Sequence, residues 1–134
     1  MARRRKKILL VEDNVDVRQL LALFMKRLGY EVHEAATGLE VVALAATTRP
    51  DLIIMDFCLP GFSGIEATRR LKIEPSTKDI PVLIITGYNI DKRRALVVGA
   101  AEILQKPIDM TMFHALLRRY LLPRTKPRRS RRKK

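Results

Sequence analysis

The chain has 134 residues, of which 47% are hydrophobic and 31% charged, so it is long enough to bury one globular core and short for two. Its one cysteine, Cys58, excludes an internal disulfide and favours a reducing compartment. The formal net charge is +13, but five of the 27 basic residues lie in 3–7 and eight in 123–134, which leaves 14 basic against 14 acidic residues in 8–122. We therefore expect one neutral domain, 8–122, between two basic ends.

Residues 1–7 form a basic N-terminal arm that runs directly into a short apolar segment, 8–11. A basic start before an apolar run is typical of a signal peptide, but this run is too short for one and ends in Glu12 and Asp13. No apolar run in the chain is long enough to span a bilayer. We expect a cytoplasmic protein without a membrane span.

Short apolar runs alternate with helical patterns through the central part of the chain. Three runs are strong, at 8–11, 52–55 and 82–85. Two weaker ones lie at 31–35 and 101–105. The helices predicted by apolar spacing and by their stop signals are 17–28, 37–49, 64–72, 91–98 and 110–122. Thr37 and Glu40 have the spacing of a capping box at the start of the second helix.

Continuous apolar strands that alternate with amphipathic helices predict a parallel sheet with helices on both faces. The fold class is therefore a doubly wound α/β domain with a five-stranded sheet. In open sheets of this kind, ligands bind beyond the carboxyl ends of the strands where the winding reverses. If the strand order is the flavodoxin-like 2-1-3-4-5, the first and third strands are neighbours, and Glu12 and Asp13 lie beside Asp56.

Four of the apolar runs stop at a polar side chain that has a chemical use. These side chains are Glu12 with Asp13, Asp56, Thr86 and Lys106. Each has a structural explanation when taken alone: acids before a helix, for example, complement its dipole by about 0.3 to 1 kcal/mol. Their joint occurrence at one edge of a sheet favours a site that binds a divalent metal and receives a phosphoryl group.

The chain resembles the receiver domains of two-component response regulators, the family that includes the chemotaxis receiver, over about residues 7–122. The motifs that carry the resemblance are Glu12-Asp13, Asp56, Pro-Gly-Phe-Ser-Gly at 60–64, Thr86-Gly87 and Lys106-Pro107. It implies a stand-alone signalling receiver rather than an enzyme. Such a protein takes a phosphoryl group from a sensor histidine kinase or a phosphotransfer protein, and then contacts an output protein or passes the phosphate on.

The chemistry of phosphoryl transfer assigns roles to the acids. The reaction needs an oxygen nucleophile in line with the phosphorus, which is Asp56, and cations that neutralise the equatorial oxygens. Magnesium prefers octahedral oxygen ligands and keeps several waters. The expected ligands of Mg²⁺ are Asp13, Asp56, the backbone carbonyl of Cys58 and, through water, Glu12.

The resemblance implies further roles beside the acids. Lys106 would pair with a phosphoryl oxygen, and the Thr86 hydroxyl would move to donate to another. The peptide bond between Lys106 and Pro107 would be cis, as in that family.

The signalling surface departs from the family pattern. Receivers commonly carry Tyr or Phe three residues before the lysine, and that ring responds to the threonine; here the position is Ile103. Tyr88, two residues after the threonine, is an alternative aromatic. We expect the partner surface near the fourth helix, fifth strand and fifth helix, with Tyr88, Arg93 and Arg94 as contacts.

The tail 123–134 is too short and too charged to bury apolar surface, so it is expected to be disordered on its own. An alternative function uses the receiver fold as a scaffold whose basic ends bind nucleic acid non-specifically. The ends contain no aromatic residue for base stacking and no helix pattern for groove recognition, so sequence-specific binding is not expected. Three other interpretations of the basic ends are attraction to anionic lipid, a role in solubility, and the start of a linker in a longer protein.

Overall fold

The apolar runs form one parallel sheet in the computed structural model, which describes residues 5–87 and 92–122. The strands are β1 (Lys7–Val11), β2 (Glu31–Ala35), β3 (Leu52–Asp56), β4 (Val82–Thr86) and β5 (Glu102–Gln105). Their order is β2-β1-β3-β4-β5, and every pair is parallel. The predicted doubly wound α/β class and the flavodoxin-like order are both confirmed.

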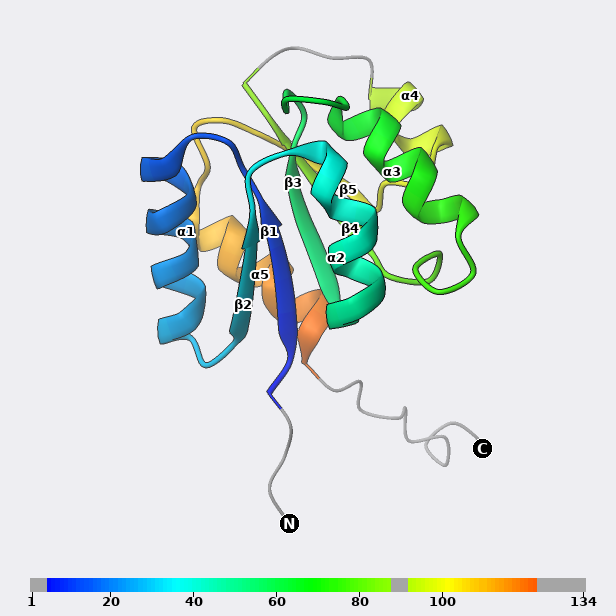
Figure 1. Ribbon diagram of the computed structural model, residues 1–134. Helices are drawn as coiled ribbons and strands as arrows, with labels where there is room; N and C mark the ends of the chain where they lie inside the picture. The colour runs from blue at the N-terminus through cyan, green and yellow to red at the C-terminus, as the bar shows by residue number, and fades with distance from the viewer. Residues whose placement is uncertain (1–4, 88–91, 123–134) are drawn as a thin grey trace, which may run out of the picture.

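Helices cover both faces of the sheet (Figure 1). They are α1 (Val15–Arg27), the 3₁₀ turn η1 (Gly38–Glu40), α2 (Val41–Thr48), α3 (Gly64–Ile73), α4 (Lys92–Val97) and α5 (Met110–Leu121). Helices α1 and α5 pack with one core cluster, and α2, α3 and α4 pack with the other. The middle strands are apolar at nearly every position because both of their faces are buried.

Short polar side chains start three of the helices. Asn14 accepts a hydrogen bond from the Val17 N–H at 3.0 Å at the start of α1, and Ser63 accepts one from Glu66 at the start of α3. Asp109 accepts two backbone N–H bonds at the start of α5. These caps fix the points at which the chain turns from a strand end into a helix.

The capping box predicted at Thr37 is wrong. Its side chain makes no cap bond, and Glu40 Oε1 instead accepts from the Ala36 N–H at 3.3 Å. The cause is a tertiary contact: the Gly38 N–H donates to the Pro60 carbonyl at 3.0 Å, so the loop after β3 fixes this turn. The result is a 3₁₀ turn before α2 rather than one continuous helix.

The two ends of the described chain lie at the same edge of the sheet. Strand β1 begins at Lys7 and α5 ends at Leu121, both at the lower end of Figure 1. The basic residues 1–4 and 123–134 lie outside the described residues, so their predicted disorder stays a prediction. Among residues 5–87 and 92–122, no helix is long and apolar enough to cross a membrane.

Candidate functional site

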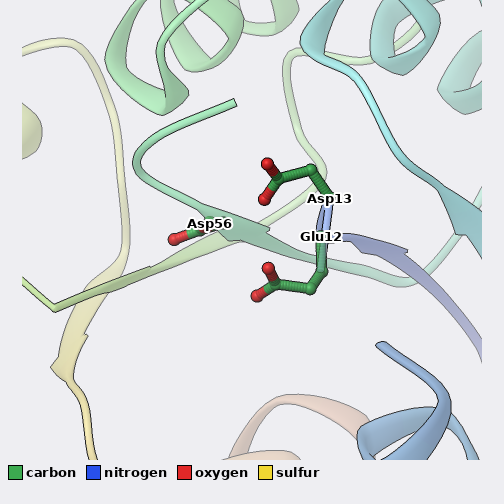
Figure 2. Close-up of side chains that lie close together, drawn as sticks. All are labelled: Glu12, Asp13 and Asp56. Carbon is green, nitrogen blue, oxygen red and sulfur yellow. The ribbon is translucent and has the colours of Figure 1, made fainter. Parts of the chain in front are cut away.

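Three carboxylates meet at the carboxyl edge of the sheet. Strands β1 and β3 are paired with Val11 opposite Met55, so Glu12 and Asp13, just after β1, lie beside Asp56, the last residue of β3. One oxygen from each of the three acids lies within 4.8 Å of the others. Figure 2 shows the three side chains projecting into a common space beyond the strand ends. The sequence prediction placed the same three acids together.

Glu12 is held by contacts with β2, with the start of α1 and with Lys106. Its side chain accepts from the Asn14 N–H at 3.1 Å and from Lys106 Nζ at 3.4 Å. Its backbone N–H donates to the Ala35 carbonyl at the end of β2, and its carbonyl accepts from the Arg18 guanidinium on α1 at 2.8 Å. These contacts leave Glu12 2% exposed, with its carboxylate fixed in the cleft.

Asp56 is also buried, with 7% of its surface exposed. Burial raises its pKa, the positive charge of Lys106 lowers it, and the nearby Asp13 raises it again. Burial likewise raises the pKa of Glu12, and the hydrogen bond from the Asn14 backbone opposes the rise. Both carboxylates therefore lie where their charges cost free energy unless a cation joins them.

Among the described residues, Lys106 brings a positive charge to these acids. Its backbone N–H donates to the Thr86 carbonyl at 2.7 Å, which ties the residue after β5 to the end of β4. The Lys106-Pro107 peptide is cis, as the resemblance implied. The ammonium lies 3.4 Å from Glu12 and 3.6 Å from Asp56, and the Thr86 side chain nearby is buried.

A cleft of about 550 Å³ opens over these groups. Its lining residues are Glu12, Asp13, Asn14, Asp56, Cys58, Gly87 and Lys106. The loop after β3 reaches it because the Gly64 N–H donates to the Phe57 carbonyl, and a Cβ at Gly64 would lie 2.7 Å from the Asp56 carbonyl oxygen. That close approach requires glycine and holds Cys58 at the rim.

Two residues that support the site were not predicted from the sequence. Asn14 lines the cleft and fixes Glu12 through its backbone, while Arg18 holds the Glu12 carbonyl from one turn into α1. The signal for Asn14 was present, because Asn directly before a helical pattern is a common N-cap. Nothing in the sequence marked Arg18.

Of the predicted signalling residues, Arg93, Arg94 and Ile103 do not line the cleft. Arg93 and Arg94 are exposed on α4, and Ile103 is half-buried on β5, packed against the cluster that contains Ala95. Tyr88 lies outside the described residues.

The three acids of the cleft could together hold a metal ion. The oxygen donors of this cleft are carboxylates, which suit a hard divalent cation, and its acids gain from added positive charge. A model of the response regulator receiver domain matches residues 8–118. The chain belongs to the response regulator receiver family. It is thus a receiver domain of two-component signalling.

Curated relatives agree with this membership. The chain is 36% identical over 118 residues to the polar-differentiation response regulator DivK of Brucella anthropi, covering 87% of this chain and 96% of DivK. It is 39% identical over 120 residues to the phosphate regulon transcriptional regulatory protein PhoB of Pseudomonas aeruginosa, covering 85% of this chain and 52% of PhoB. The chain therefore spans only about half the length of PhoB.

A solved structure also resembles this receiver in its fold. The receiver domain of a Pseudomonas aeruginosa sensor histidine kinase matches with a TM-score of 0.79 and 30% identity. The match covers 87% of this chain and 98% of that one. That crystal structure has a magnesium ion coordinated in its active-site cleft.

Proposed function

We propose that this receiver accepts a phosphoryl group on Asp56, with Mg²⁺, from a sensor histidine kinase or a phosphotransfer protein. The observation that carries the proposal is the meeting of Glu12, Asp13 and Asp56 within 4.8 Å, with one ammonium close to two of them. The relay then proceeds by protein contact or by transfer of the phosphate to another protein.

Asp56 is the nucleophile of the proposed step. One of its carboxylate oxygens forms a bond to phosphorus while the bond from phosphorus to the donor's imidazole nitrogen breaks. The imidazole leaves with the electron pair and takes a proton, and the product is an acyl phosphate. Burial favours the reaction, because a poorly hydrated carboxylate has less solvent to shed before it attacks.

Lys106 and Thr86 would stabilise the phosphoryl group. The ammonium already lies 3.6 Å from Asp56 Oδ1, within reach of an oxygen on a phosphate carried there. The Lys106 backbone N–H donates to the Thr86 carbonyl, so the two residues are neighbours at the strand ends, and the proposed role of the Thr86 hydroxyl is to donate to a second oxygen. Both contacts place positive or donor groups where negative charge increases.

The residues that would hold Mg²⁺ are Asp13, Asp56, the Cys58 carbonyl and, through water, Glu12. The ion, when bound, supplies positive charge that neutralises the phosphoryl oxygens. The buried Glu12 and the exposed Asp13 differ in role: Glu12 is already fixed by Asn14 and Lys106, whereas Asp13 can turn toward an ion.

Output would use the face around α4 and β5. Arg93 and Arg94 present exposed positive charge there, and Tyr88 is proposed as an aromatic contact. Ile103 replaces the ring that responds to the threonine in many receivers. We propose that this face signals by a movement of α4 rather than by an aromatic side chain at 103.

Labelling with a small phosphodonor tests the proposal. The full chain is incubated with acetyl phosphate and Mg²⁺, and acid-labile phosphate is counted per chain. We expect one phosphate, none in Asp56→Asn and none after chelation of the metal. The matched control is Asp16→Asn, which removes an exposed carboxylate at the same end of the domain but outside the cluster.

The Asp16→Asn control should keep full labelling if the phosphate is accepted by the acidic cluster rather than by any exposed carboxylate at this end of the domain. Equal labelling of the Asp56→Asn variant would refute the assignment of the nucleophile. Labelling that survives chelation would refute the role of the metal.

A further inference from the structure

A groove of about 530 Å³ runs between α2 and α3, which lie side by side on one face of the sheet (Figure 1). Most of the side chains that line it are apolar, and they come from η1, α2, α3 and the loop before α3. None of the residues that line the acidic cleft lines this groove. The α2–α3 groove is therefore a second, separate feature of the described surface.

The wall that α2 contributes carries small side chains. Ala43 and Ala46 lie three residues apart and share the face of α2 that lines the groove. The buried residues of the same helix, Val41 and Ala45, belong to the core cluster beneath it. The two alanines therefore leave a hollow that a larger apolar side chain from another surface can fill.

Two large apolar side chains stand exposed at opposite ends of the groove. Leu39 is 63% exposed and Ile73 is 61% exposed. Leu39 lies against the loop before α3, because a Cβ at Gly61 would be 2.7 Å from its Cγ. Ile73 is the last of the ten residues of α3, which is about 15 Å long. Covering both side chains would remove apolar surface from water.

One cation and one anion flank these apolar groups, four residues apart on the same face of α3 and its C-cap. Arg70 donates through Nε to Glu66 at 2.8 Å, and its guanidinium lies 4.0 Å from the centre of the Phe62 ring. These contacts hold the guanidinium in place, so it loses little freedom when it pairs again. The exposed Glu74 carboxylate has no ion pair within the described part of the chain, so both charged groups can take a partner.

This arrangement is complementary to itself. A two-fold axis that sets α3 antiparallel to α3 of a second copy brings Arg70 of each chain to Glu74 of the other. The same rotation exchanges the ends of the groove, so Leu39 of each chain approaches Ile73 of the other. A partner with a single sign of charge would pair with only one of the two groups.

We propose that the α2–α3 groove is the interface of a homodimer in which each chain presents the same surface to the other. One shallow groove from each chain makes this a weak, reversible dimer rather than an obligate one. The acidic cleft lies outside the interface, so both chains stay open to a phosphodonor. The inference rests on the groove and does not depend on the phosphoacceptor.

Sedimentation equilibrium of the full, unphosphorylated chain tests the proposal. The net charge of +13 opposes association, and salt at about 200 mM screens that repulsion. The two-fold arrangement also places the amino edges of the two sheets, where the strands begin, at opposite ends of the dimer. We expect the average mass to rise from one chain toward two between about 5 and about 500 µM protein. A mass that stays at one chain throughout would overturn the proposal.

Exchange of the two charges tests the geometry. Arg70→Glu and Glu74→Arg each place like charges opposite one another, and symmetry makes every change act twice. We expect each variant to weaken dimerisation by about tenfold or more. The double variant restores opposite charges in both contacts and should return to within about threefold of the original association constant. Failure of the double variant to recover would refute this pairing.

Arg69→Glu is the matched control for charge. Arg69 is exposed on α3 and pairs with Glu66, as Arg70 does, but it does not line the groove. We expect this variant to change the association constant by less than about threefold. A loss as large as that of Arg70→Glu would show that net charge, and not the groove, controls association.

Substitution of the apolar end tests the location independently of charge. Ile73→Gln should weaken dimerisation by about tenfold, because the change removes apolar contact from both ends of the interface. Val97→Gln is its control, since Val97 is 84% exposed on α4 and lies outside the groove. We expect the control to associate as the unmodified chain does. Equal weakening by the two changes would overturn the assignment of the interface to the α2–α3 groove.

Discussion

The two edges of the sheet carry carboxylates in opposite circumstances. At the amino edge, Asp51 and Glu102 have partners of their own: the Lys7 N–H for Asp51 and Arg119 for Glu102. At the carboxyl edge, Glu12 and Asp56 are buried together and share the single ammonium of Lys106. These two amino-edge acids are thus paired within the domain, whereas the acids of the carboxyl edge hold more negative charge than the contacts of the described residues neutralise.

This difference shows where the folded state buries charge at an unfavourable free energy. A buried carboxylate is normally paired or neutralised, because desolvation of its charge is expensive. At Glu66, which is partly exposed and paired with Arg69 and Arg70, the pKa falls to about 2. At Asp56 burial raises the pKa instead. The unfavourable arrangement lies at the edge where a cation and a phosphoryl group are proposed to bind.

Removal of the shared cation should give the largest effect. Lys106→Met leaves two buried acids without their ammonium, and we expect the free energy of unfolding of the metal-free protein to fall by about 2 kcal/mol. This value is below the 3 to 5 kcal/mol typical of a broken buried pair because Lys106 is 32% exposed. Urea denaturation measures it. Lys26→Met, which removes an exposed partner of Glu34, is the control and should change little.

Matched Asp→Asn changes at the two edges should have opposite signs. Without metal, Asp56→Asn relieves a buried charge and should stabilise the protein by about 1 kcal/mol. Asp51→Asn weakens a charge-assisted hydrogen bond to Lys7 and should destabilise it by about 1 kcal/mol. Thermal and urea unfolding at neutral pH check both. Destabilisation by both changes would contradict the difference between the carboxylates of the two edges.

The pH dependence of stability should follow the raised pKa values of Glu12 and Asp56. An acid with a raised pKa binds more protons in the folded state, so its favourable contribution is present below its unfolded pKa and is lost as pH rises through the folded value. The metal-free protein should therefore become more stable as pH falls from 7 toward 5. Asp56→Asn should show a smaller gain over the same range.

Glu66 acts in the opposite direction at lower pH. Its pKa is lowered from 4.5 to about 2, so its contribution is lost as pH falls through that window. A urea midpoint that fell steadily from pH 7 to pH 5 would contradict the assignment of raised pKa values to the cleft.

The exposed pair at the amino edge should give the smallest effect. Glu102→Gln removes the charge partner of Arg119, which is 66% exposed, and should cost about 0.5 kcal/mol. Phosphate labelling should stay unchanged, because Glu102 lies at the far edge of the sheet. A labelling defect in this variant would show that the two edges are not independent.

Most of the fold follows from the sequence because its middle strands are buried on both faces. Runs such as 52–55 and 82–85 are apolar throughout, which distinguishes them from the amphipathic helices around them. The start of α2 did not follow from the sequence. There, Thr37 and Glu40 have the right spacing, but the contact of Gly38 with Pro60 decides the conformation, and that contact spans 22 residues.

The site was predictable in its residues but not in its full support. The acids and Lys106 stand at strand ends, so the sheet topology is enough to bring them together. The support of Glu12 depends on the backbone N–H of Asn14 and on the rotamer of Arg18. No sequence pattern encodes the rotamer of Arg18.

The location of the phosphate on the chain tests the central claim most directly. After labelling with acetyl phosphate and Mg²⁺, borohydride reduces an aspartyl phosphate to homoserine, and mass spectrometry of peptides locates the change. We predict homoserine at position 56 alone, with Glu12 and Asp13 intact. Reduction at position 13, or a phosphate that borohydride leaves unchanged, would contradict the claim that the buried Asp56 is the phosphoacceptor of this receiver.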